Sequence, residues 1–442
     1  PPHNPGNPQV TEQFPSPPAP SPTSEASTEA RRALIARLRA VRAETVRRTR
    51  ALSPEDMVVQ SMPDASPAKW HLAHTTWFFE TVVLQPLAPG DRLFDERWQP
   101  LFNSYYESLG PRHPRPQRGL LTRPSLTEVL AYRAAVEERL ERFVCEADET
   151  CWAQAAALLE LGLQHEQQHQ ELLWTDVLHL MSQNPLQPAA DPQAPEFTPA
   201  PSPDAAWWSH PGGPASIGHD GGDFAFDNET PRHAVLLAPF RLACGLVTQG
   251  QWWDFVQDGG YRRASLWLSE GWATVQAQAW RGPAYWLYES TACDAPPAGR
   301  FGLRGVVPWR PDDPVSHVSF HEAVAFAEWA GARLPTEAEW EAAAGVSASG
   351  PMDDPVEAAG GGLQDLFGQV WQWTRSAYDP YPGFRPWSGA VGEYNGKFMD
   401  SQRVLRGSSL ATPPGHARLT YRNFFPPTAR WQFTGLRLAQ DA

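Results

Sequence analysis

The stretch Leu158–Met181, LLELGLQHEQQHQELLWTDVLHLM, carries two histidines and a glutamate in an H-x3-H-x-E pattern. On a helix, residues four positions apart lie on one face about one turn apart, so His165 and His169 could hold one metal ion. Glu171 points away from that face, and we expect it to orient a ligand or partner, not to bind the metal. Two histidines with this spacing also occur on helix surfaces without binding a metal ion, so the metal site has to be judged together with the rest of the chain.

The whole chain limits the class of protein. Its 442 residues are enough for two or three domains. The net charge of −14 and the lack of a long basic run argue against a nucleic acid partner. The four cysteines form no C-x-x-C pair, so neither a zinc ribbon nor a disulfide framework is indicated. Few cysteines, no signal pattern at the start and no apolar run long enough for a membrane favour the cytoplasm.

Composition divides the chain into four parts. Residues 1–28 are rich in Pro, Ser and Thr, which predicts a disordered tail. Helical periodicity predicts an antiparallel four-helix bundle over residues 29–182. Its helices are expected at about residues 30–52, 66–87, 125–147 and 152–181. Residues 183–206 are Pro- and Ala-rich and are interpreted as a linker that hangs free or wraps the surface. Residues 207–442 combine Gly, Trp, short strands and few helices, so the predicted fold class is α+β.

A third histidine could complete the metal site. His74 lies in the middle of a helical face that it shares with Trp70 and Trp77. A histidine among aromatic residues is usually a packed core residue, but metal sites in bundles are built from inward side chains on facing helices. We therefore expect His74 to join the pair on the later helix. His71, almost one turn earlier, remains a weaker candidate.

The connection over residues 88–124 is unusually long, and such loops in compact domains are usually functional or disordered. It contains two adjacent tyrosines and four arginines, Tyr105, Tyr106, Arg112, Arg115, Arg118 and Arg123. The guanidinium fork suits recognition of a carboxylate, although arginines on a loop can also be simply solvated. We interpret this connection as functional because of its aromatic and basic residues.

Five motifs in the C-terminal half are typical of one fold. They are VTQGQWWDFVQDGGY (247–261), PVSHVS (314–319), RLPTEAEWE (333–341), GQVWQWT (368–374) and LRGSS (405–409). They resemble the formylglycine-generating-enzyme/sulfatase-modifying-factor fold, a C-type-lectin-like architecture, and the N-terminal bundle resembles a DinB-type domain. With the H-x3-H-x-E pattern, the chain from about residue 30 onward resembles the ergothioneine sulfoxide synthases (EgtB). The subgroup that uses free cysteine is the nearest match, through residues 104–119 and 421–427.

The resemblance implies an enzyme with one non-heme iron(II) ion held by His74, His165 and His169. Imidazole ligands alone would also suit zinc or copper, so iron follows from the resemblance and not from the ligands. The implied reaction uses O2 to join the sulfur of a thiol, expected to be cysteine, to C2 of the imidazole of hercynine, the betaine of histidine. The product is a sulfoxide in ergothioneine biosynthesis.

The resemblance also assigns the substrate contacts. Gln168 is expected beside the imidazole of hercynine, and Asn423, Phe424 and Phe425 around its betaine end. Aromatic faces attract a trimethylammonium group through cation–π interaction, so this assignment is physically reasonable.

Two further assignments concern the long connection. Tyr105 and Tyr106 match tyrosines that supply a proton or an electron near the iron-bound oxygen. Arg115, and less directly Arg112, match arginines that bind the carboxylate of cysteine.

Several positions depart from the usual motifs, namely Gln249, Gln369, Gln372, Ser408 and Leu410. If some of them lined the pocket, the sulfur donor would be in doubt. A related selenoneine synthase, which joins a selenosugar to hercynine, is therefore an alternative.

Three other functions are less consistent with the motifs. A formylglycine-generating enzyme needs cysteines in its C-terminal core, and this chain has none after Cys293. Cys293 itself lies in an insertion-like stretch and is expected to be a bystander. A DinB-type thiol transferase with zinc or nickel would need neither the tyrosines nor the second domain. A non-enzymatic lectin-like protein would suit the Trp-rich half but not the metal motif.

Overall fold

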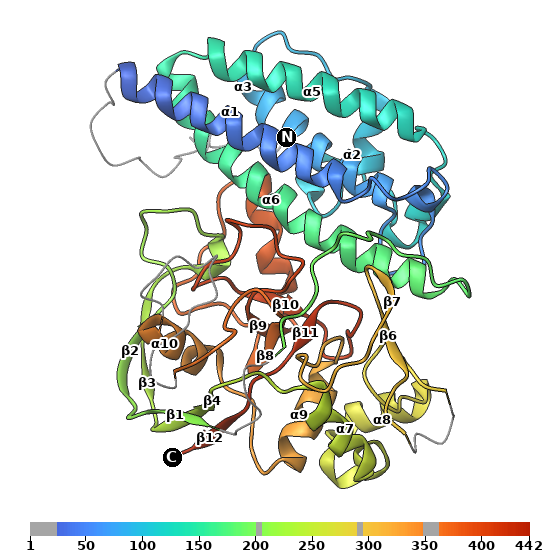
Figure 1. The fold of residues 1–442 in the computed structure, drawn as a ribbon. Helices are drawn as coiled ribbons and strands as arrows, with labels where there is room; N and C mark the ends of the chain where they lie inside the picture. The colour runs from blue at the N-terminus through green and yellow to red at the C-terminus, as the bar shows by residue number, and fades with distance from the viewer. Residues whose placement is uncertain (1–23, 200–205, 290–294, 348–361) are drawn as a thin grey trace, which may run out of the picture.

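The computed structural model describes residues 24–199, 206–289, 295–347 and 362–442 (Figure 1). A layer of long helices lies on a mixed region of short strands and helices, and α6 runs along the boundary between the two (Figure 1). The predicted α+β class is confirmed. Residues 1–23 of the predicted tail and Cys293 lie outside the described residues.

Within the described residues, four helices form the N-terminal bundle. They are α1 (Ser24–Arg47), α2 (Ala68–Phe78), α5 (Leu126–Glu146) and α6 (Glu149–Ser182). α2 continues through a π-helical segment, η2 (Phe79–Leu84), into α3 (Gln85–Leu87). Gly162 lets α6 lie directly against this segment, because a Cβ atom there would be 2.4 Å from the ring of Phe79. The close approach places the histidines of α6 opposite α2.

The predicted boundary of the tail at residue 28 is wrong, because α1 already begins at Ser24. Ser27 is buried and donates to the carboxylate of Glu149, and Arg31 donates to the carbonyl oxygens of Val144 and Ala147. These bonds tie the first turns of α1 to the junction of α5 and α6, so a Pro- and Ser-rich composition does not prevent helix formation there. At its other end, α1 stops at Arg47 and the chain reaches residue 52 in tighter turns.

Side-chain caps fix where α5 and α6 begin. Ser125 accepts a hydrogen bond from the backbone N–H of Glu128, whose carboxylate accepts from the Ser125 N–H in return, a capping box. Asp148 accepts from the N–H of Cys151 at the start of α6. The start and phase of the helix that carries His165 and His169 are therefore set by local sequence.

The long connection over residues 88–124 is ordered in short helical pieces. They are η3 (Glu96–Trp98), α4 (Gln99–Phe102), η4 (Glu107–Leu109) and η5 (Arg115–Leu120). Trp98 and Phe102 anchor it in the bundle core, and Lys69 of α2 donates to the carbonyl oxygens of Leu121 and Pro124. The connection is thus held firmly enough to present side chains to a site.

The C-terminal region contains four small sheets within the described residues. Their strand orders are β1-β4-β12, β10-β9-β8-β11, β2-β3 and β5-β6-β7, and β11 is parallel to β8 whereas the other pairs are antiparallel. The strands are β1 (Trp207–His210), β2 (Gly213–Ile217), β3 (His233–Leu237), β4 (Phe240–Ala243), β5 (Trp286–Leu287), β6 (Gly299–Gly302), β7 (Gly305–Val307), β8 (Trp371–Ala377), β9 (Arg403–Gly407), β10 (Asn423–Phe425), β11 (Thr434–Gly435) and β12 (Ala439–Asp441). The helices are α7 (Gln249–Gln257), α8 (Ser269–Gln278), α9 (Phe320–Trp329) and α10 (Glu337–Ser347). The sheet with β8 and β10 is joined to α6 by a hydrogen bond from the Trp371 indole to Glu171.

β4 ends at Ala243, where the Arg437 guanidinium donates to the carbonyl oxygens of Ala243 and Cys244. At the start of α10, the Thr336 hydroxyl accepts from the Glu339 N–H and the Glu339 carboxylate accepts from the Thr336 N–H, a capping box.

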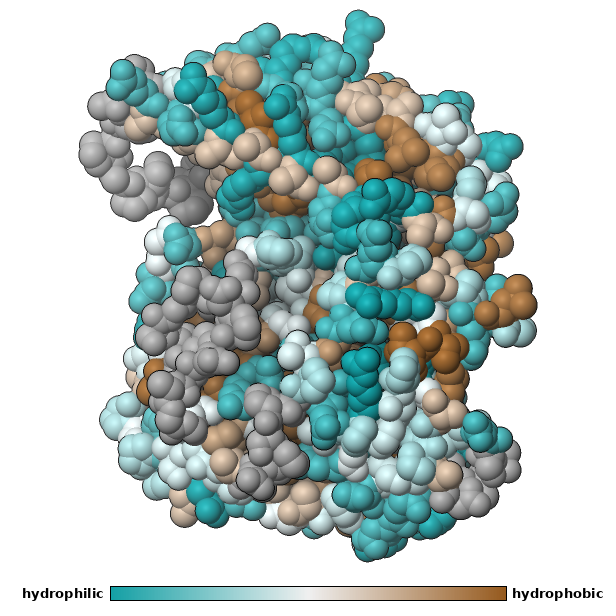
Figure 2. All heavy atoms as spheres, in the orientation of Figure 1, coloured by the Kyte–Doolittle hydropathy of each residue, from teal (hydrophilic) through white to brown (hydrophobic). Residues whose placement is uncertain are grey.

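Residues 183–199 wrap over the C-terminal region instead of hanging free. The N–H groups of Ala190 and Asp191 donate to the Leu303 carbonyl oxygen, and Phe197 is buried beside Arg300. On the face shown in Figure 2, small hydrophobic patches are interspersed with hydrophilic residues over both halves. Among the helices that the structure describes, none has the length and apolar character needed to cross a membrane.

Candidate metal centre and substrate cavity

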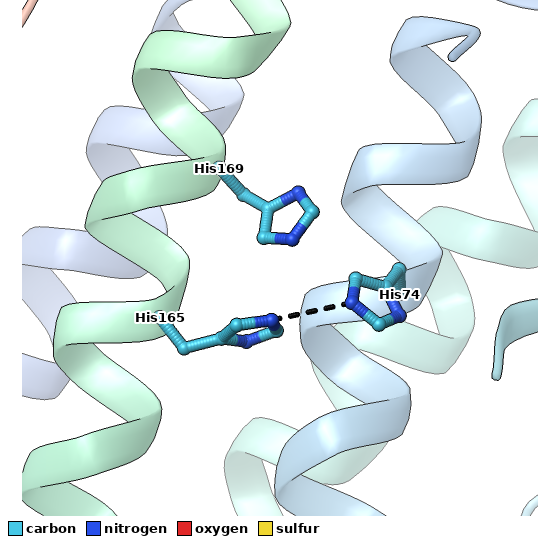
Figure 3. Close-up of side chains that lie close together, drawn as sticks. All are labelled: His74, His165 and His169. Atoms are coloured by element: carbon cyan, nitrogen blue, oxygen red, sulfur yellow. Dashed lines mark hydrogen bonds between the residues drawn. The ribbon is translucent and has the colours of Figure 1, made fainter. Parts of the chain in front are cut away.

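Three histidines face one another between α2 and α6 (Figure 3). His165 and His169 stand one turn apart on α6, and His74 projects from α2, so that one ring nitrogen of each lies within 4.8 Å of the others. The Nε2 atoms of His74 and His165 are 3.2 Å apart. Burial lowers the pKa of each imidazole, to about 3 for His165, so the rings are neutral at ordinary pH.

This geometry fits a metal ion. When two nitrogens bind the same metal ion at about 2.1 Å, and the N–metal–N angle is near 90–110°, the nitrogens are separated by about 3.0–3.4 Å. His74 donates from Nδ1 to the Phe102 carbonyl oxygen at 2.6 Å, which leaves the Nε2 lone pair free to bind. Imidazole donors suit iron, zinc, copper and nickel, so the ligands fit Fe(II) without selecting it.

His71, the weaker candidate, is placed beside the set and not in it. Its Nδ1 lies 2.9 Å from Nδ1 of His169, and its Nε2 lies 3.1 Å from the Asp176 carboxylate. Both ring nitrogens therefore already have partners, and neither is free for a metal ion.

A cavity of about 320 Å³ opens beside the histidines, between the bundle and the C-terminal sheet. Besides the three histidines it is lined by most of the residues assigned from the sequence, Tyr105, Tyr106, Arg115, Gln168, Asn423, Phe424 and Phe425. Both halves of the chain thus contribute to one site. The predicted residues from the two halves are brought together as expected.

Arg112 does not line this cavity, and the structure does not support its assignment to the substrate. Its side chain is 44 % exposed, pairs with Glu107 at 2.9 Å and donates to the carbonyl oxygen of Ser104 at 3.0 Å. The turn at Gly110, where φ is +107°, separates Glu107 from Arg112 and lets the arginine fold back on its own loop. The local ion pair therefore holds it away from the histidines.

Arg115 and Arg118 make the cavity basic at one end. Arg115 donates to the Tyr105 hydroxyl at 2.9 Å, and Arg118 lies 3.4 Å from the centre of the Trp70 ring. Burial lowers the pKa of Arg118 to about 9, and its Nε finds no hydrogen-bond partner among the described residues. No carboxylate forms an ion pair with Arg115 or Arg118 in the described parts of the chain, which favours an anionic ligand here.

The two tyrosines differ in their surroundings. The Tyr105 hydroxyl is held by Arg115, whereas Tyr106 is only 4 % exposed and packs beside Trp77 and Phe78. Burial raises the pKa of Tyr106 far above its usual value, so its hydroxyl stays protonated and can act as a hydrogen-bond or proton donor.

The opposite wall is aromatic and comes from β10. Phe424 stacks on Tyr378 with ring centres 4.1 Å apart, and Phe425 meets Trp431 edge to face at 6.0 Å. From α6, the amide of Gln168 lies 3.5 Å from the Tyr421 hydroxyl. The site therefore has a basic end and an aromatic wall beside the histidine set.

Several lining residues were missed, namely Arg118 as a site residue, Asp176, Tyr394, His416, Tyr421 and Trp431. Asp176 had a usable signal, because it lies on the helical face of His165 and His169. Tyr421 also had one, because it is the first residue of the motif over residues 421–427. Tyr394 and Trp431 had none, since the sequence is rich in aromatic residues throughout that half.

The motif departures do not reach the cavity. Gln372 is buried and accepts from the Trp340 indole and from Arg437, and Gln369 accepts from the Thr198 N–H. Ser408 accepts from the Gly368 N–H. None of these positions lines the cavity, so the condition under which they would put the sulfur donor in doubt is not met.

Comparisons with known proteins agree with both halves. Residues 14–173 match the DinB superfamily, and residues 193–359 and 354–442 match the sulfatase-modifying factor enzyme 1-like domain. A formylglycine-generating enzyme from Streptomyces coelicolor is 30 % identical over 52 % of this chain and 88 % of its own length.

Two relatives match both halves together. A hercynine oxygenase from Mycolicibacterium smegmatis is 33 % identical over 86 % of this chain and 92 % of its own length. A hercynine oxygenase from Mycolicibacterium thermoresistibile is 33 % identical over 86 % of this chain and 88 % of its own length. The chain therefore belongs to the hercynine oxygenase (EgtB) family, with a DinB bundle and a sulfatase-modifying-factor domain.

Proposed function

We propose that this protein uses Fe(II) and O2 to join the sulfur of a thiol, with cysteine as the expected donor, to C2 of the hercynine imidazole. In the overall reaction one C–H bond and one S–H bond are lost, one C–S bond forms, and O2 supplies the sulfoxide oxygen and one molecule of water. The observation that carries the proposal is the common cavity, in which a three-histidine set, a basic end and an aromatic wall face one another.

His74, His165 and His169 would hold the iron. Bound Fe(II) supplies open coordination positions for a thiol sulfur and for O2, together with the redox change that their reaction requires. The chain itself keeps the three imidazoles neutral by burial, so that each can offer a lone pair.

The basic end fits the carboxylate of the thiol substrate. Arg115 and Arg118 lack an acidic partner among the described residues, and a guanidinium binds a carboxylate through paired hydrogen bonds. A carboxylate would also offset the burial of Arg118, whose lowered pKa reflects the desolvation of its charge. This arrangement favours an amino-acid thiol over a neutral one.

The aromatic wall fits the trimethylammonium group of hercynine. Phe424, Phe425 and Trp431 present ring surfaces to the cavity, and Asn423 adds an amide beside them. Gln168 stands on α6 one residue before His169, where its amide can bond an imidazole nitrogen of the substrate. Burial keeps the Tyr106 hydroxyl protonated, so it can donate a proton to an oxygen atom that derives from O2.

The test is an assay of anaerobically reconstituted Fe(II) protein with hercynine and O2, with products identified by mass spectrometry. Cysteine, γ-glutamylcysteine and a selenosugar are supplied in parallel reactions. A hercynine–cysteine sulfoxide is the expected product. A product from the selenosugar alone would assign the protein to selenoneine synthesis, and no product from an iron-loaded protein would contradict the proposed reaction.

A further inference from the structure

We propose that His71 and Asp176 are positioning residues that fix the ring orientation and proton placement of His169 through one hydrogen-bond relay. This inference rests on the proposed function in so far as His169 is taken as a metal ligand. It concerns two residues that would bind neither the metal nor a substrate directly.

The relay joins three side chains from the two helices that carry the histidine set. Nδ1 of His71 lies 2.9 Å from Nδ1 of His169, and Nε2 of His71 lies 3.1 Å from Oδ2 of Asp176. The backbone N–H of Ser66 donates to the same Oδ2 at 2.7 Å. His71 is 2 % exposed and Asp176 is 6 % exposed, so little water competes for these bonds.

With His71 neutral and Asp176 ionised, the partners allow one arrangement of protons. An ionised carboxylate only accepts hydrogen bonds, so Nε2 of His71 carries its proton and Nδ1 of His71 is a bare acceptor. Nδ1 of His169 must then carry the proton that it donates to His71. The lone pair of His169 is left on Nε2, where a metal ion can use it.

Helix geometry explains why the relay is possible. Asp176 follows His169 by seven residues, two turns along the same face of α6, and His71 precedes His74 by almost one turn on α2. The contact between α2 and α6 that brings the metal ligands together therefore also brings the relay partners together. The spacing of His169 and Asp176 on α6 and that of His71 and His74 on α2 do not by themselves indicate that His71 contacts His169.

The other two histidines are supported differently. His74 donates from Nδ1 to a backbone carbonyl oxygen, that of Phe102, and Nδ1 of His165 has no partner in the described parts of the chain. Of the three, His169 is the one whose Nδ1 bonds another side chain in the described parts of the chain. Changes at His71 or Asp176 are expected to act on one ligand and leave the other two in place.

Asp176→Leu makes the sharpest variant because it removes the acceptor of the relay. An Asn would be less informative, since the Ser66 N–H and Nε2 of His71 both bond Oδ2 and an Asn oxygen there could still accept from both. With Leu, no acceptor keeps the proton of His71 on Nε2, and His71 can carry it on Nδ1, opposite the proton on Nδ1 of His169. His169 can then restore the bond only by moving its proton to Nε2, which blocks the metal.

The experiment measures the dissociation constant of Fe(II) for the full chain and for Asp176→Leu, His71→Phe and the double variant. A loss of affinity of about 10- to 100-fold is expected in each, with the double variant no weaker than His71→Phe, because both residues act through one relay. His179→Phe is the matched control, since His179 lies on α6 but bonds Ser61 outside the histidine set. Unchanged affinity in both single variants, or losses that add, would overturn the proposal.

A second readout separates the relay from the proposed function. The ¹⁵N chemical shifts of histidine in the metal-free protein report which ring nitrogen carries the proton. His169 is expected to be protonated at Nδ1 in the wild type and to lose this preference in Asp176→Leu. A wild type protonated at Nε2 of His169 would overturn the relay, whereas a wild type that binds no Fe(II) but shows the Nδ1 form would contradict only the metal centre.

Discussion

Glu171 of α6 accepts a hydrogen bond of 2.8 Å from the indole N–H of Trp371 in β8, and thereby joins the helix of the histidines to the C-terminal sheet. The same carboxylate accepts from the hydroxyl groups of Ser409 at 2.5 Å and Thr412 at 2.6 Å. The last member of the H-x3-H-x-E pattern therefore orients a partner, as its position on the helix predicted. Through Trp371 it links the helix of the histidines to the sheet that also carries Phe424 and Phe425.

Replacing Glu171 by Ala is expected to loosen this junction without disturbing the metal ligands. Three donors would lose their acceptor, a destabilisation of about 3 kcal/mol, seen as a lower midpoint of thermal unfolding. The KM for hercynine should rise, because the wall that binds it belongs to the other half of the chain. Fe(II) affinity should stay at the wild-type value.

Glu141→Ala is the control for this variant, since Glu141 forms an ion pair with Arg39 on the exposed side of the bundle. Such pairs contribute only about 0–1 kcal/mol. If Glu171→Ala lost Fe(II) affinity but kept its unfolding midpoint, Glu171 would have to be a metal ligand.

His74→Ala is expected to remove Fe(II) binding and turnover together. Two imidazoles on one helix remain in this variant, and they cannot enclose the ion from the α2 side. Iron content after desalting and sulfoxide formation are measured on the same sample, with His179→Ala as the control. Full iron occupancy and full activity in His74→Ala would move the third ligand to His71.

Local patterns in the sequence predicted the parts of the site that depend on one helix. The spacing of His165 and His169 and the helical face of His74 follow from neighbours within two turns. The other parts of the site depend on contacts between elements that are far apart in the sequence. The bond between His71 and His169 exists only because α2 packs against α6, and no spacing pattern indicates it.

Two predictions differ from the structure for the same reason. Arg112 was matched, less directly than Arg115, to a substrate-binding arginine, but it lies outside the cavity and pairs with Glu107 on its own loop. Residues 24–28 were assigned to a tail by composition, yet Ser27 finds Glu149 on another helix and the chain folds there. Composition describes what a segment would do alone, and a tertiary partner changes the result.

Tyr106→Phe is expected to leave Fe(II) and hercynine binding intact while it changes the product. The variant keeps the ring that packs on Trp77 and Phe78 but loses the hydroxyl, whose pKa is raised by burial. Without this proton donor, turnover should shift from the sulfoxide towards simple oxygenation of the thiol. Mass spectrometry of the sulfoxide and of the sulfinic acid gives the ratio.

Tyr105→Phe provides the comparison for the adjacent tyrosine, because its hydroxyl is held by Arg115. We expect that variant to raise the KM of the thiol donor more than it changes the product ratio. An unchanged sulfoxide yield in Tyr106→Phe would refute the role of Tyr106 as proton donor.

Phe425→Leu is expected to weaken hercynine binding but not histidine binding. Leu keeps an apolar surface and loses the aromatic face that attracts a trimethylammonium group, an interaction of about 0.5–2 kcal/mol, or roughly two- to thirtyfold in affinity. Titration of the metal-free protein with each ligand gives the two dissociation constants. Equal losses for hercynine and histidine would show that Phe425 contributes only shape.

A buried ion cluster behind the histidines gives a pH-dependent prediction. The Glu166 carboxylate bonds Arg42 at 3.0 Å, Arg133 at 2.8 Å and the Thr45 hydroxyl at 2.7 Å. Although burial alone would raise the pKa of Glu166, Arg42 and Arg133 lower it to about 2. A carboxyl group whose pKa is lowered on folding stabilises the folded protein above its unfolded pKa, near 4.5, and loses this contribution as the pH falls towards 2.

Glu166→Gln should therefore be less stable than the wild type at pH 7, by about 3 kcal/mol, because two buried guanidinium groups lose their charged partner. The difference between the two proteins should narrow as the pH falls below about 4.5, since the wild-type carboxylate then takes up a proton as well. Unfolding midpoints are compared at matched pH and ionic strength, with Glu141→Gln as an exposed control. A difference that stayed constant between pH 7 and pH 3 would mean that Glu166 acts through its shape and hydrogen bonds, and not through its charge.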